Sequence, residues 1–311
     1  MIWGLTISYK DKMYDILIIG SGPAGLSAAI YGKRAQLSLA VIEKDYMSTG
    51  QIAVTERVDN YPGLYGVSGY DLGEKFRSHA EALGAEFLDA EVAAIERDGE
   101  NWRVNFADGT SQTAKAVIYT AGASHRKLGV PGGDKERISY CAVCDGFFYK
   151  EKTVAVIGGG DTALGDALYL SKLAKTVYLV HRRDEFRANK TLQKQVGETA
   201  NIVPVLGAVL TEVTGEAKAD GINYTQGGAE KHLDVDGIFA AIGSVPGTAP
   251  LKGVCELDKL GYVVAGEDCV TSAPGIFAAG DVRTTPLRQV ITAAADGANA
   301  VNSAEKYLSQ R

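Results

Sequence analysis

Cysteine is scarce in this sequence, whose 311 residues include only Cys141, Cys144, Cys255 and Cys269. Small secreted proteins that depend on disulfides for stability carry many more cysteines for their length. A tetrahedral zinc site needs four ligands, usually from two close pairs, and only one close pair is present here. The sequence therefore favours neither class of protein and predicts no metal site.

Long apolar runs and an excess of positive charge are also missing. No apolar run reaches the roughly 18 residues of a membrane span, so we expect no membrane helix. The net charge of -6 disfavours nucleic acid and anionic membranes as partners. No basic segment followed by an apolar one opens the sequence, so we expect no signal peptide and a cytoplasmic location. The first strand pattern starts only after Met13, and residues 1–12 are interpreted as a short extension or a misplaced start.

Glycine, in contrast, is abundant. The 37 glycines make up about 12% of the chain, against a usual level of ~7%. This excess indicates tight turns and backbone loops that approach ligands closely. The length favours two domains, each large enough to form its own core.

The segment after Met13 has the pattern of a nucleotide-binding βαβ unit. "DILIIG" is a continuous apolar run, typical of a buried parallel strand. "GSGPAG" then places Gly20, Gly22 and Gly25 in G-x-G-x-x-G spacing, which allows a tight turn, close approach of a pyrophosphate and close helix packing. Glu43 ends the second strand, where a carboxylate accepts hydrogen bonds from ribose hydroxyls.

A second unit repeats the pattern near the middle of the chain. "KTVAVIGGGDTALGDALYL" contains a buried strand and then Gly158, Gly160 and Ala163 in G-x-G-x-x-A spacing. The phosphates of a nucleotide would again face the start of a helix, where free N–H groups and the helix dipole favour anions.

The two units differ at the end of their second strands. Where the first unit has Glu43, the second has His181, Arg182 and Arg183, with Arg187 one turn further on. Guanidinium groups bind a 2′-phosphate through charge-assisted hydrogen bonds, whereas a carboxylate would repel it. The second unit therefore predicts NADPH, and the pair of sites suggests hydride transfer from NADPH to a bound flavin.

"SYCAVCDGFFYK" places Cys141 and Cys144 in C-x-x-C spacing, with Asp145 directly after them. Such a pair could be a metal clamp, a structural disulfide or a redox couple. A single C-x-x-C near βαβ patterns favours the redox couple. Asp145 is the nearest acid or base for the thiols, and its alternative role is a plain turn with Gly146. The three aromatic residues at 147–149 are expected to pack in the core.

The order of patterns predicts an α/β protein with one nucleotide-binding domain inserted into another. Alternating strands with turns at Asp98-Gly99 and Asp108-Gly109 follow the first unit, and the second unit has a comparable tail. We expect a discontinuous first domain at residues 1–121 and 249–311, and an inserted domain at 122–248. The crossings near "TAGASH" and "SVPGTAP" are rich in glycine, proline and small residues, as hinges often are.

Taken together, "GSGPAG", "NYPG", "CAVCDG", "GGGDTA", "HRRDEFRA" and "GIFAAGDV…RQV" resemble the bacterial, low-molecular-weight thioredoxin reductases in order and spacing. The resemblance runs from Met13 to the C-terminus. It implies two Rossmann-like domains of three-layer ββα architecture, the NADPH domain inserted into the FAD domain, and a homodimer. It also implies FAD contacts at Gly20, Gly22, Pro23, Ala24, Gly25, Glu43, Gln51, Asn60, Asp281, Arg288 and Gln289. The implied NADPH contacts are Gly158, Gly160, Asp161, Thr162, Ala163, His181, Arg182, Arg183 and Arg187.

The activity that this resemblance implies is reduction of oxidised thioredoxin. Hydride passes from NADPH to FAD, electrons pass on to the Cys141–Cys144 disulfide, and the dithiol exchanges with the partner's disulfide. The resemblance puts Cys144 nearer the flavin, and which cysteine attacks the partner is left open. Three positions depart from the family pattern: "ALGDA" replaces "AVEEA", "TAGA" replaces "ATGA", and Gly247 replaces an asparagine.

Other functions are compatible with the same patterns. A flavin-dependent dithiol oxidase, a ferredoxin-fed reductase or a reductase of another thioredoxin-like partner would have the same fold. The first two would not need the arginines after the second unit. A reductase of peroxidases would need an additional N-terminal redox domain, for which residues 1–12 are too short. A non-enzymatic nucleotide-binding or metal-binding protein would not be reduced by NADPH.

Overall fold

The computed structural model describes residues 12–45, 47–55 and 57–311. The extension expected at residues 1–12 lies outside these described residues, except for Lys12. The chain forms two compact units: unit 1 is Met1–Ser124 with Val245–Arg311, and unit 2 is His125–Ser244. Unit 2 is inserted into unit 1, with crossings at 124/125 and 244/245, whereas the sequence placed them at 121/122 and 248/249.

The two crossings run side by side. Strands β7 (Ala123–His125) and β16 (Ser244–Pro246) pair as a two-stranded ribbon. Before the ribbon, the amide of Gly247 donates to the carbonyl of Gly122 at 3.0 Å. The observed crossings lie within this ribbon, three and four residues inside the predicted ones, and the pairing of the two strands is not indicated by a local pattern of small residues.

Unit 1 is built on a seven-stranded sheet. Its strands are β1 (Met13–Ile19), β2 (Leu39–Glu43), β3 (Glu86–Asp89), β4 (Val92–Asp98), β5 (Asn101–Phe106), β6 (Ser111–Tyr119) and β17 (Ile276–Ala278). Their order is β3-β2-β1-β6-β5-β4, and β17 also pairs with β6. Strands β1, β2, β3, β6 and β17 pair in parallel, whereas β4 and β5 join antiparallel.

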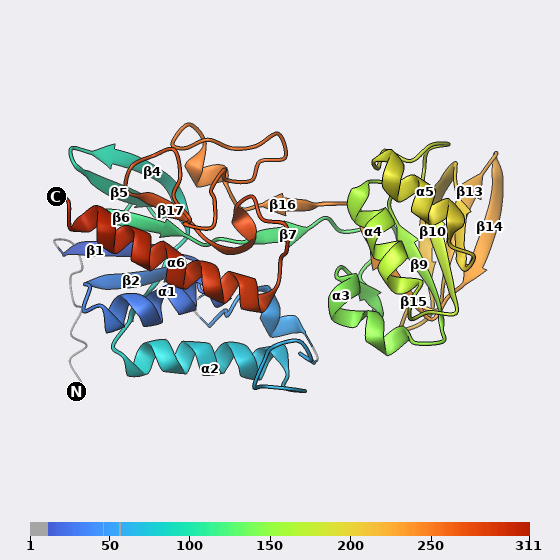
Figure 1. Cartoon of the computed structure of the whole chain (residues 1–311), viewed down its shortest axis with the longest axis horizontal. Helices are drawn as coiled ribbons and strands as arrows, with labels where there is room; N and C mark the ends of the chain where they lie inside the picture. Colours follow the sequence, from blue (N-terminus) through green and yellow to red (C-terminus); the bar gives the residue numbers. More distant parts are fainter. Residues whose placement is uncertain (1–11, 46, 56) are drawn as a thin grey trace. The chain divides into compact units, whose positions relative to one another are not determined.

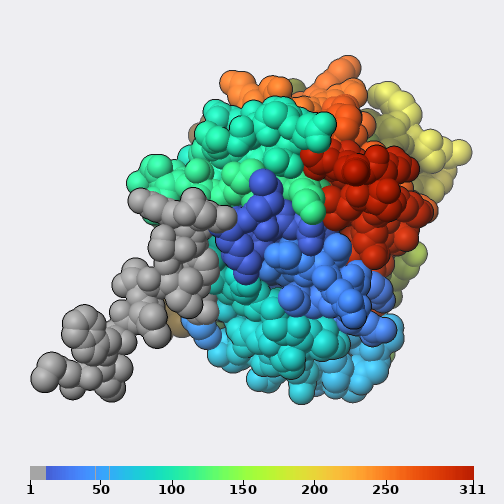
Figure 2. Space-filling model, turned by 90° about the vertical axis from the view of Figure 1, so that its left-hand side faces the viewer, coloured from blue at the N-terminus to red at the C-terminus, as the bar shows by residue number. Residues whose placement is uncertain are grey.

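The longer helices pack on one face of this sheet, whereas loops and short 3₁₀ segments pack on the other (Figure 1). The helical segments are α1 (Pro23–Arg34), η2 (Gln51–Val54), α2 (Gly69–Ala82), η4 (Ala249–Leu251), η5 (Gly280–Val282) and α6 (Val290–Leu308). The alternation of β1 sets the two cores: Ile16 and Ile18 pack with α1 and α6, whereas Leu17 and Ile19 pack towards β4 and β5. Helix α6 lies alongside α1 and forms one flank of unit 1 (Figure 2).

Unit 2 has three layers. Its strands are β8 (Ile138–Ser139), β9 (Thr153–Ile157), β10 (Thr176–Val180), β11 (Ile202–Val205), β12 (Ala208–Thr214), β13 (Gly221–Gln226), β14 (Ala229–Asp234) and β15 (Gly237–Ala240), and its helices are α3 (Ala142–Asp145), η3 (Gly146–Tyr149), α4 (Asp161–Leu170) and α5 (Lys190–Glu198). A parallel sheet of order β11-β10-β9-β15-β8 lies between helices and the antiparallel sheet β12-β13-β14. Val154 and Val156 face the helices, and Ala155 and Ile157 face the antiparallel sheet.

Candidate functional site

The first glycine turn joins β1 to α1, and packing explains two of its glycines. Gly20 has φ +105°, and a Cβ there would lie 2.7 Å from the carbonyl oxygen of Thr120. A Cβ on Gly25 would lie 1.9 Å from the carbonyl oxygen of Gly20. Gly22 differs, because the nearest atom to its Cβ position is 3.9 Å away, on Gly50. The backbone at Gly22 is therefore open to a ligand.

Helix α1 begins without a side-chain cap. Gly22 is its N-cap residue, Pro23 occupies the first turn and no side chain bonds the free amides. Proline costs nothing at this position because its missing N–H would have no partner within the helix. Unsatisfied amides and the helix dipole together form an anion site, which suits the pyrophosphate of a dinucleotide. Ala24 is buried behind this turn.

Glu43 stands at the end of β2, as predicted. Its Oε2 accepts hydrogen bonds from the amide and hydroxyl of Ser21, each at 3.0 Å, and its Oε1 accepts from the amide of Lys44 at 2.9 Å. A fourth donor, the amide of Asp45, lies 3.4 Å from Oε1, and this long contact is the one that a ribose hydroxyl could replace. The sequence analysis missed Ser21, which fixes this carboxylate against the glycine turn.

The fold pairs two of the other predicted contacts of unit 1 with each other and brings a third next to the glycine turn. Asn60 Nδ2 donates to Gln289 Oε1 at 2.8 Å, joining residues far apart in the sequence. Gln51 donates to the carbonyl of Ala123, next to Gly122. Gly50, the residue before Gln51, packs closely on the glycine turn: a Cβ on Gly50 would lie 2.9 Å from the Cα of Gly22.

Asp281 lies in η5, next to the first turn of α1. The preceding Gly280 would place a Cβ 3.0 Å from the Cβ of Ala24. Arg288 lies over the ring of Tyr262 at 4.3 Å, and its Nε donates weakly to the carbonyl of Asp281 at 3.5 Å. Burial raises the pKa of Asp281 to about 6, although the positive charge of Arg288 acts in the opposite direction. The Asp281 carboxylate accepts no hydrogen bond from the part of the chain that the structure describes, so it is available to a ligand.

The second glycine turn joins β9 to α4. A Cβ on Gly158 would lie 2.4 Å from the carbonyl oxygen of Ala241 and 2.7 Å from the Cβ of Ala163. No atom lies within 4 Å of the Cβ position of Gly160, which is the uncapped N-cap of α4. This turn repeats the open helix start of unit 1 and suits a second pyrophosphate.

Two polar residues at the start of α4 have different environments. Asp161 Oδ1 accepts from the amide of Asn189 at 2.7 Å and from its Nδ2 at 3.1 Å. Asn189 in turn caps α5 by accepting from the amide of Leu192 at 3.0 Å. Asp161 therefore holds the loop after β10, and Thr162 beside it is exposed. The contact between Asp161 and Asn189 was not predicted from the sequence, because the two residues lie 28 positions apart.

The loop after β10 concentrates positive charge. Arg182, Arg183 and Arg187 are exposed, and none forms an ion pair with a described residue. His181 is only 6% exposed, and its Nε2 is buried without a hydrogen-bond partner among the described residues. Burial, and then the three arginines, lower the pKa of His181. Three exposed guanidinium groups that form no ion pair with a described residue fit an anionic ligand.

The C-x-x-C pair forms a disulfide, Cys141–Cys144, at the start of α3. Cys141 is the N-cap residue, and its Sγ accepts from the amide of Cys144 at 3.2 Å. Both cysteines are half-buried. In the described part of the chain, no group of three or more His, Cys, Asp or Glu side chains could hold a metal.

Asp145 belongs to the same small network. Ser139 donates its hydroxyl hydrogen to Asp145 Oδ2 at 2.6 Å, and the Ser139 oxygen accepts from the amide of Cys141 at 3.1 Å. The amide of Asp145 donates to the carbonyl of Cys141 at 3.1 Å. The redox loop thus has a carboxylate held within it by hydrogen bonds, and Ser139 is a member that the sequence analysis missed.

The prediction that all three aromatic residues after the disulfide pack in the core is wrong for two of them. Tyr149 is buried against Phe239, but Phe147 is 66% exposed and Phe148 is 42% exposed. A 3₁₀ helix has about three residues per turn, so Gly146 and Tyr149 share the inward face and the two residues between them point outward. An exposed apolar surface therefore adjoins the disulfide.

The remaining cysteines are free and unreactive. Burial raises the pKa of the Cys255 thiol to about 11 and that of Cys269 to about 12. A thiol that stays protonated is a poor nucleophile. The disulfide chemistry of this chain is therefore assigned to Cys141 and Cys144.

None of the helices that the structure describes has the length and hydropathy to cross a membrane.

Comparison with known proteins agrees with this arrangement. Residues 14–297 match the family model "Pyridine nucleotide-disulphide oxidoreductase". The chain is 39% identical to thioredoxin reductase of Listeria monocytogenes over 307 residues, covering 97% of this chain and 96% of the relative. Identity is also 39% to thioredoxin reductase of Bacillus subtilis, with the same coverage. The crystal structure of thioredoxin reductase from Streptococcus pyogenes superposes with a TM-score of 0.90 at 39% identity, over 96% of this chain and 99% of that one. The chain therefore belongs to the thioredoxin reductases of the pyridine nucleotide-disulphide oxidoreductase family.

Proposed function

We propose that this enzyme uses NADPH and FAD to reduce the disulfide of a thioredoxin or thioredoxin-like protein. The observation that supports it best is the disulfide of unit 2, which shares that unit with a nucleotide turn flanked by three arginines without acidic partners. A dithiol oxidase or a ferredoxin-fed reductase would have no use for these arginines. In the overall reaction, one NADPH and one proton convert one partner disulfide to a dithiol.

The residues of unit 1 fit FAD. The open backbone at Gly22 and the uncapped start of α1 suit its pyrophosphate, and Glu43 and Asp281 offer acceptors to hydroxyl groups. The half-buried carboxylate of Asp281 accepts no hydrogen bond from a described residue, so its acceptor sites are available to a hydroxyl group of the cofactor. The residues proposed to hold FAD are those predicted: Gly20, Gly22, Pro23, Ala24, Gly25, Glu43, Gln51, Asn60, Asp281, Arg288 and Gln289. When bound, FAD would supply the two-electron relay between NADPH and the disulfide.

The residues of unit 2 fit NADPH as the reductant. Gly158, Gly160 and Ala163 would admit the pyrophosphate, while Asp161 and Thr162 begin the helix behind it. Arg182, Arg183 and Arg187 would bind the 2′-phosphate through charge-assisted hydrogen bonds, and His181, which stacks on Phe186 of the same loop, would hold that loop in place. NADH lacks this phosphate and would leave the same groups unpaired.

The chemistry with the partner is thiol–disulfide exchange at Cys141 and Cys144. A thiolate of the reduced pair attacks one partner sulfur, a mixed disulfide forms and the other partner sulfur leaves as a thiolate. The second cysteine then attacks the mixed disulfide, which re-forms Cys141–Cys144 and releases the partner as a dithiol. Asp145, held by Ser139, is proposed to take up and return the thiol proton.

The exposed side chains beside the disulfide suit a protein substrate. Val143, Phe147 and Phe148 are 45%, 66% and 42% exposed and would be covered by a docked partner. Large exposed apolar groups commonly mark interaction sites. A homodimeric enzyme in the cytoplasm belongs to the same proposal, as the family resemblance implies.

The decisive experiment follows NADPH oxidation by the purified protein, with and without thioredoxins of its host. We expect a yellow protein whose flavin is bleached anaerobically by NADPH, and NADPH consumption that depends on oxidised thioredoxin. Consumption that requires only oxygen would instead identify an oxidase. A protein with no flavin absorbance after reconstitution with FAD would overturn the proposal.

A further inference from the structure

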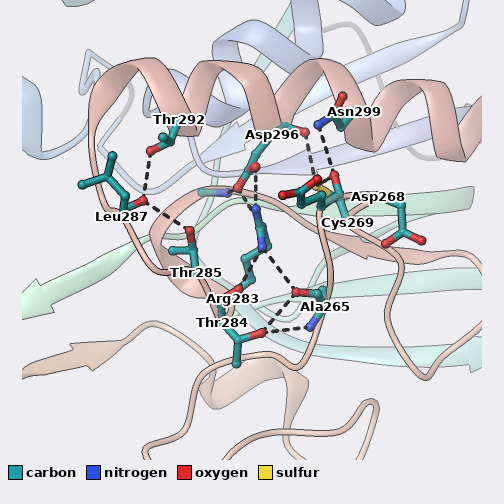
Figure 3. Close-up of polar contacts among 12 residues, drawn as sticks. Ala265, Asp268, Cys269, Arg283, Thr284, Thr285, Leu287, Thr292, Asp296 and Asn299 are labelled. Carbon is teal, nitrogen blue, oxygen red and sulfur yellow. Dashed lines mark hydrogen bonds and ion pairs between the residues drawn. The ribbon is translucent and has the colours of Figure 1, made fainter.

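Helix α6 buries an ion pair between Asp296 and Arg283. Their side chains are 8% and 7% exposed, and the guanidinium binds the carboxylate at two points. Arg283 Nε donates to Asp296 Oδ2 and Nη2 donates to Oδ1, both at 2.7 Å (Figure 3). Two-point pairing of this kind fixes the relative orientation of both groups, as well as their distance.

The pair holds both ends of the turn that contains Asp281. Asp296 Oδ2 also accepts from the amide of Gly280 at 2.9 Å. Arg283 Nη1 donates to the carbonyl of Thr284 at 2.8 Å and to that of Ala265 at 3.3 Å (Figure 3). The residues before and after Asp281 are thus bound to one buried carboxylate and its partner.

Helix α6 is itself fixed on α1, whose first turn is the proposed pyrophosphate site. A Cβ on Gly297 would lie 2.2 Å from the carbonyl oxygen of Ala24, so the two helices are in close contact beside Asp296. Ser27 Oγ donates to the carbonyl of Ala294 at 2.6 Å. The ion pair therefore sets the Asp281 turn relative to the glycine turn through a single rigid helix.

Stability alone does not account for such a pair. Desolvation of two charges offsets much of their attraction, and apolar residues of similar volume often stabilise a core as well or better. What apolar residues cannot provide is the directed bond to the Gly280 amide and to the two carbonyls. The distinctive contribution of the pair is therefore the position of the turn.

We propose that Asp296 and Arg283 are positioning residues for FAD, which hold the Asp281 carboxylate at the distance from the start of α1 that the bound cofactor requires. This inference rests on the proposed function, because it presumes that unit 1 binds FAD. It assigns neither residue a contact with the cofactor. Its consequence is that loss of the pair weakens FAD binding even in a folded protein.

The test uses the full-length protein stripped of FAD, and measures both FAD affinity by fluorescence titration and unfolding by circular dichroism. Asp296→Asn breaks the two-point pairing, and the double variant Asp296→Leu with Arg283→Met removes both charges. We expect the double variant to regain stability lost in Asp296→Asn but not FAD affinity, which should fall by about tenfold or more, the effect of one charge-assisted hydrogen bond. The absorption spectrum of bound flavin should shift in both variants.

Asn299→Ala is the matched control. Asn299 lies one turn further along the same face of α6 and donates to the carbonyl of Glu267 at 3.1 Å, away from the Asp281 turn. It should bind FAD as the wild type does. If these pair variants do not fold, Arg283→Lys decides the matter, because it keeps both charges and loses the two-point geometry.

The outcomes separate the two proposals. Wild-type protein that takes up no FAD would refute the proposed function. Wild-type protein that binds FAD, together with folded pair variants of unchanged affinity and spectrum, would refute the positioning role alone. Weakened binding by folded pair variants, with Asn299→Ala unaffected, would support it.

Discussion

A methyl group on Gly159 would lie 2.3 Å from Nδ1 of His181. The middle residue of "GGG" is thus required by the histidine at the end of β10, and the amide of Arg187 donates to the Gly159 carbonyl at 2.8 Å. His181, the loop that carries the arginines and the second glycine turn therefore pack directly against one another.

Gly159→Ala should therefore displace His181 and the loop behind it. We expect the KM for NADPH to rise by about tenfold or more, as when a charge-assisted contact is lost, while FAD content stays unchanged. Steady-state kinetics and flavin absorbance measure the two effects. Gly197→Ala, in α5, is the control, because no atom lies within 4 Å of its Cβ position. Equal kinetics for the two variants would show that His181 is not held in this way.

The arginine loop is expected to select NADPH over NADH. Each charge-assisted hydrogen bond contributes roughly 1.5–3 kcal/mol, or about one to two decades in affinity. Arg182→Ala and Arg187→Ala should raise the KM for NADPH by about that factor and change the KM for NADH little. Lys231→Ala removes an exposed charge from β14 of the same unit and should change neither. Unaltered cofactor preference in the arginine variants would contradict the assignment.

The cysteine pair is expected to act after flavin reduction. Cys141→Ser and Cys144→Ser should keep FAD and its anaerobic reduction by NADPH, because the nucleotide contacts lie elsewhere in the chain. Thioredoxin reduction should be lost in both, since a single thiol cannot close the disulfide. Stopped-flow absorbance and a thioredoxin-coupled assay report the two steps separately. Thioredoxin turnover at the wild-type rate by either variant would rule out this role.

Local pattern was sufficient to predict the nucleotide turns, because each lies within one strand, turn and helix. Contacts across the chain were different. The bond between Asn60 and Gln289 was not predicted, because the family resemblance implied each residue only as an FAD contact. The pair of Asp296 with Arg283 had no local signal, because its partners meet only when α6 packs on α1. A single 3₁₀ turn is likewise too short to show a period, so the outward direction of Phe147 was not predictable.

The last prediction concerns the cost of the buried Asp281 carboxylate. Burial raises its pKa from 3.8 to about 6 in the protein without FAD. Between these values the folded state keeps a proton that the unfolded state has lost, so stability falls as pH rises through this window. Above about pH 6, the ionised Asp281 carboxylate lowers the free energy of unfolding by about 3 kcal/mol, the equivalent of a difference of about two pKa units. Asp281, which carries this cost, is also proposed to bind the cofactor, and perturbed pKa values are common at functional sites.

Asp281→Asn should therefore stabilise the FAD-free protein by about 1–3 kcal/mol at pH 8, and by much less near pH 4, where wild-type Asp281 is protonated when folded. The same change should weaken FAD binding, because a carboxylate that accepts hydroxyl hydrogens is lost. Urea unfolding of FAD-free protein at both pH values measures the gain in the free energy of unfolding, and FAD titration measures the loss of affinity. Asp89→Asn, at an exposed position on β3 in the same unit, is the control and should alter neither quantity. If Asp281→Asn instead lowered stability at pH 8, the carboxylate would have a stabilising partner in the folded protein and its role as a ligand-facing group would be wrong.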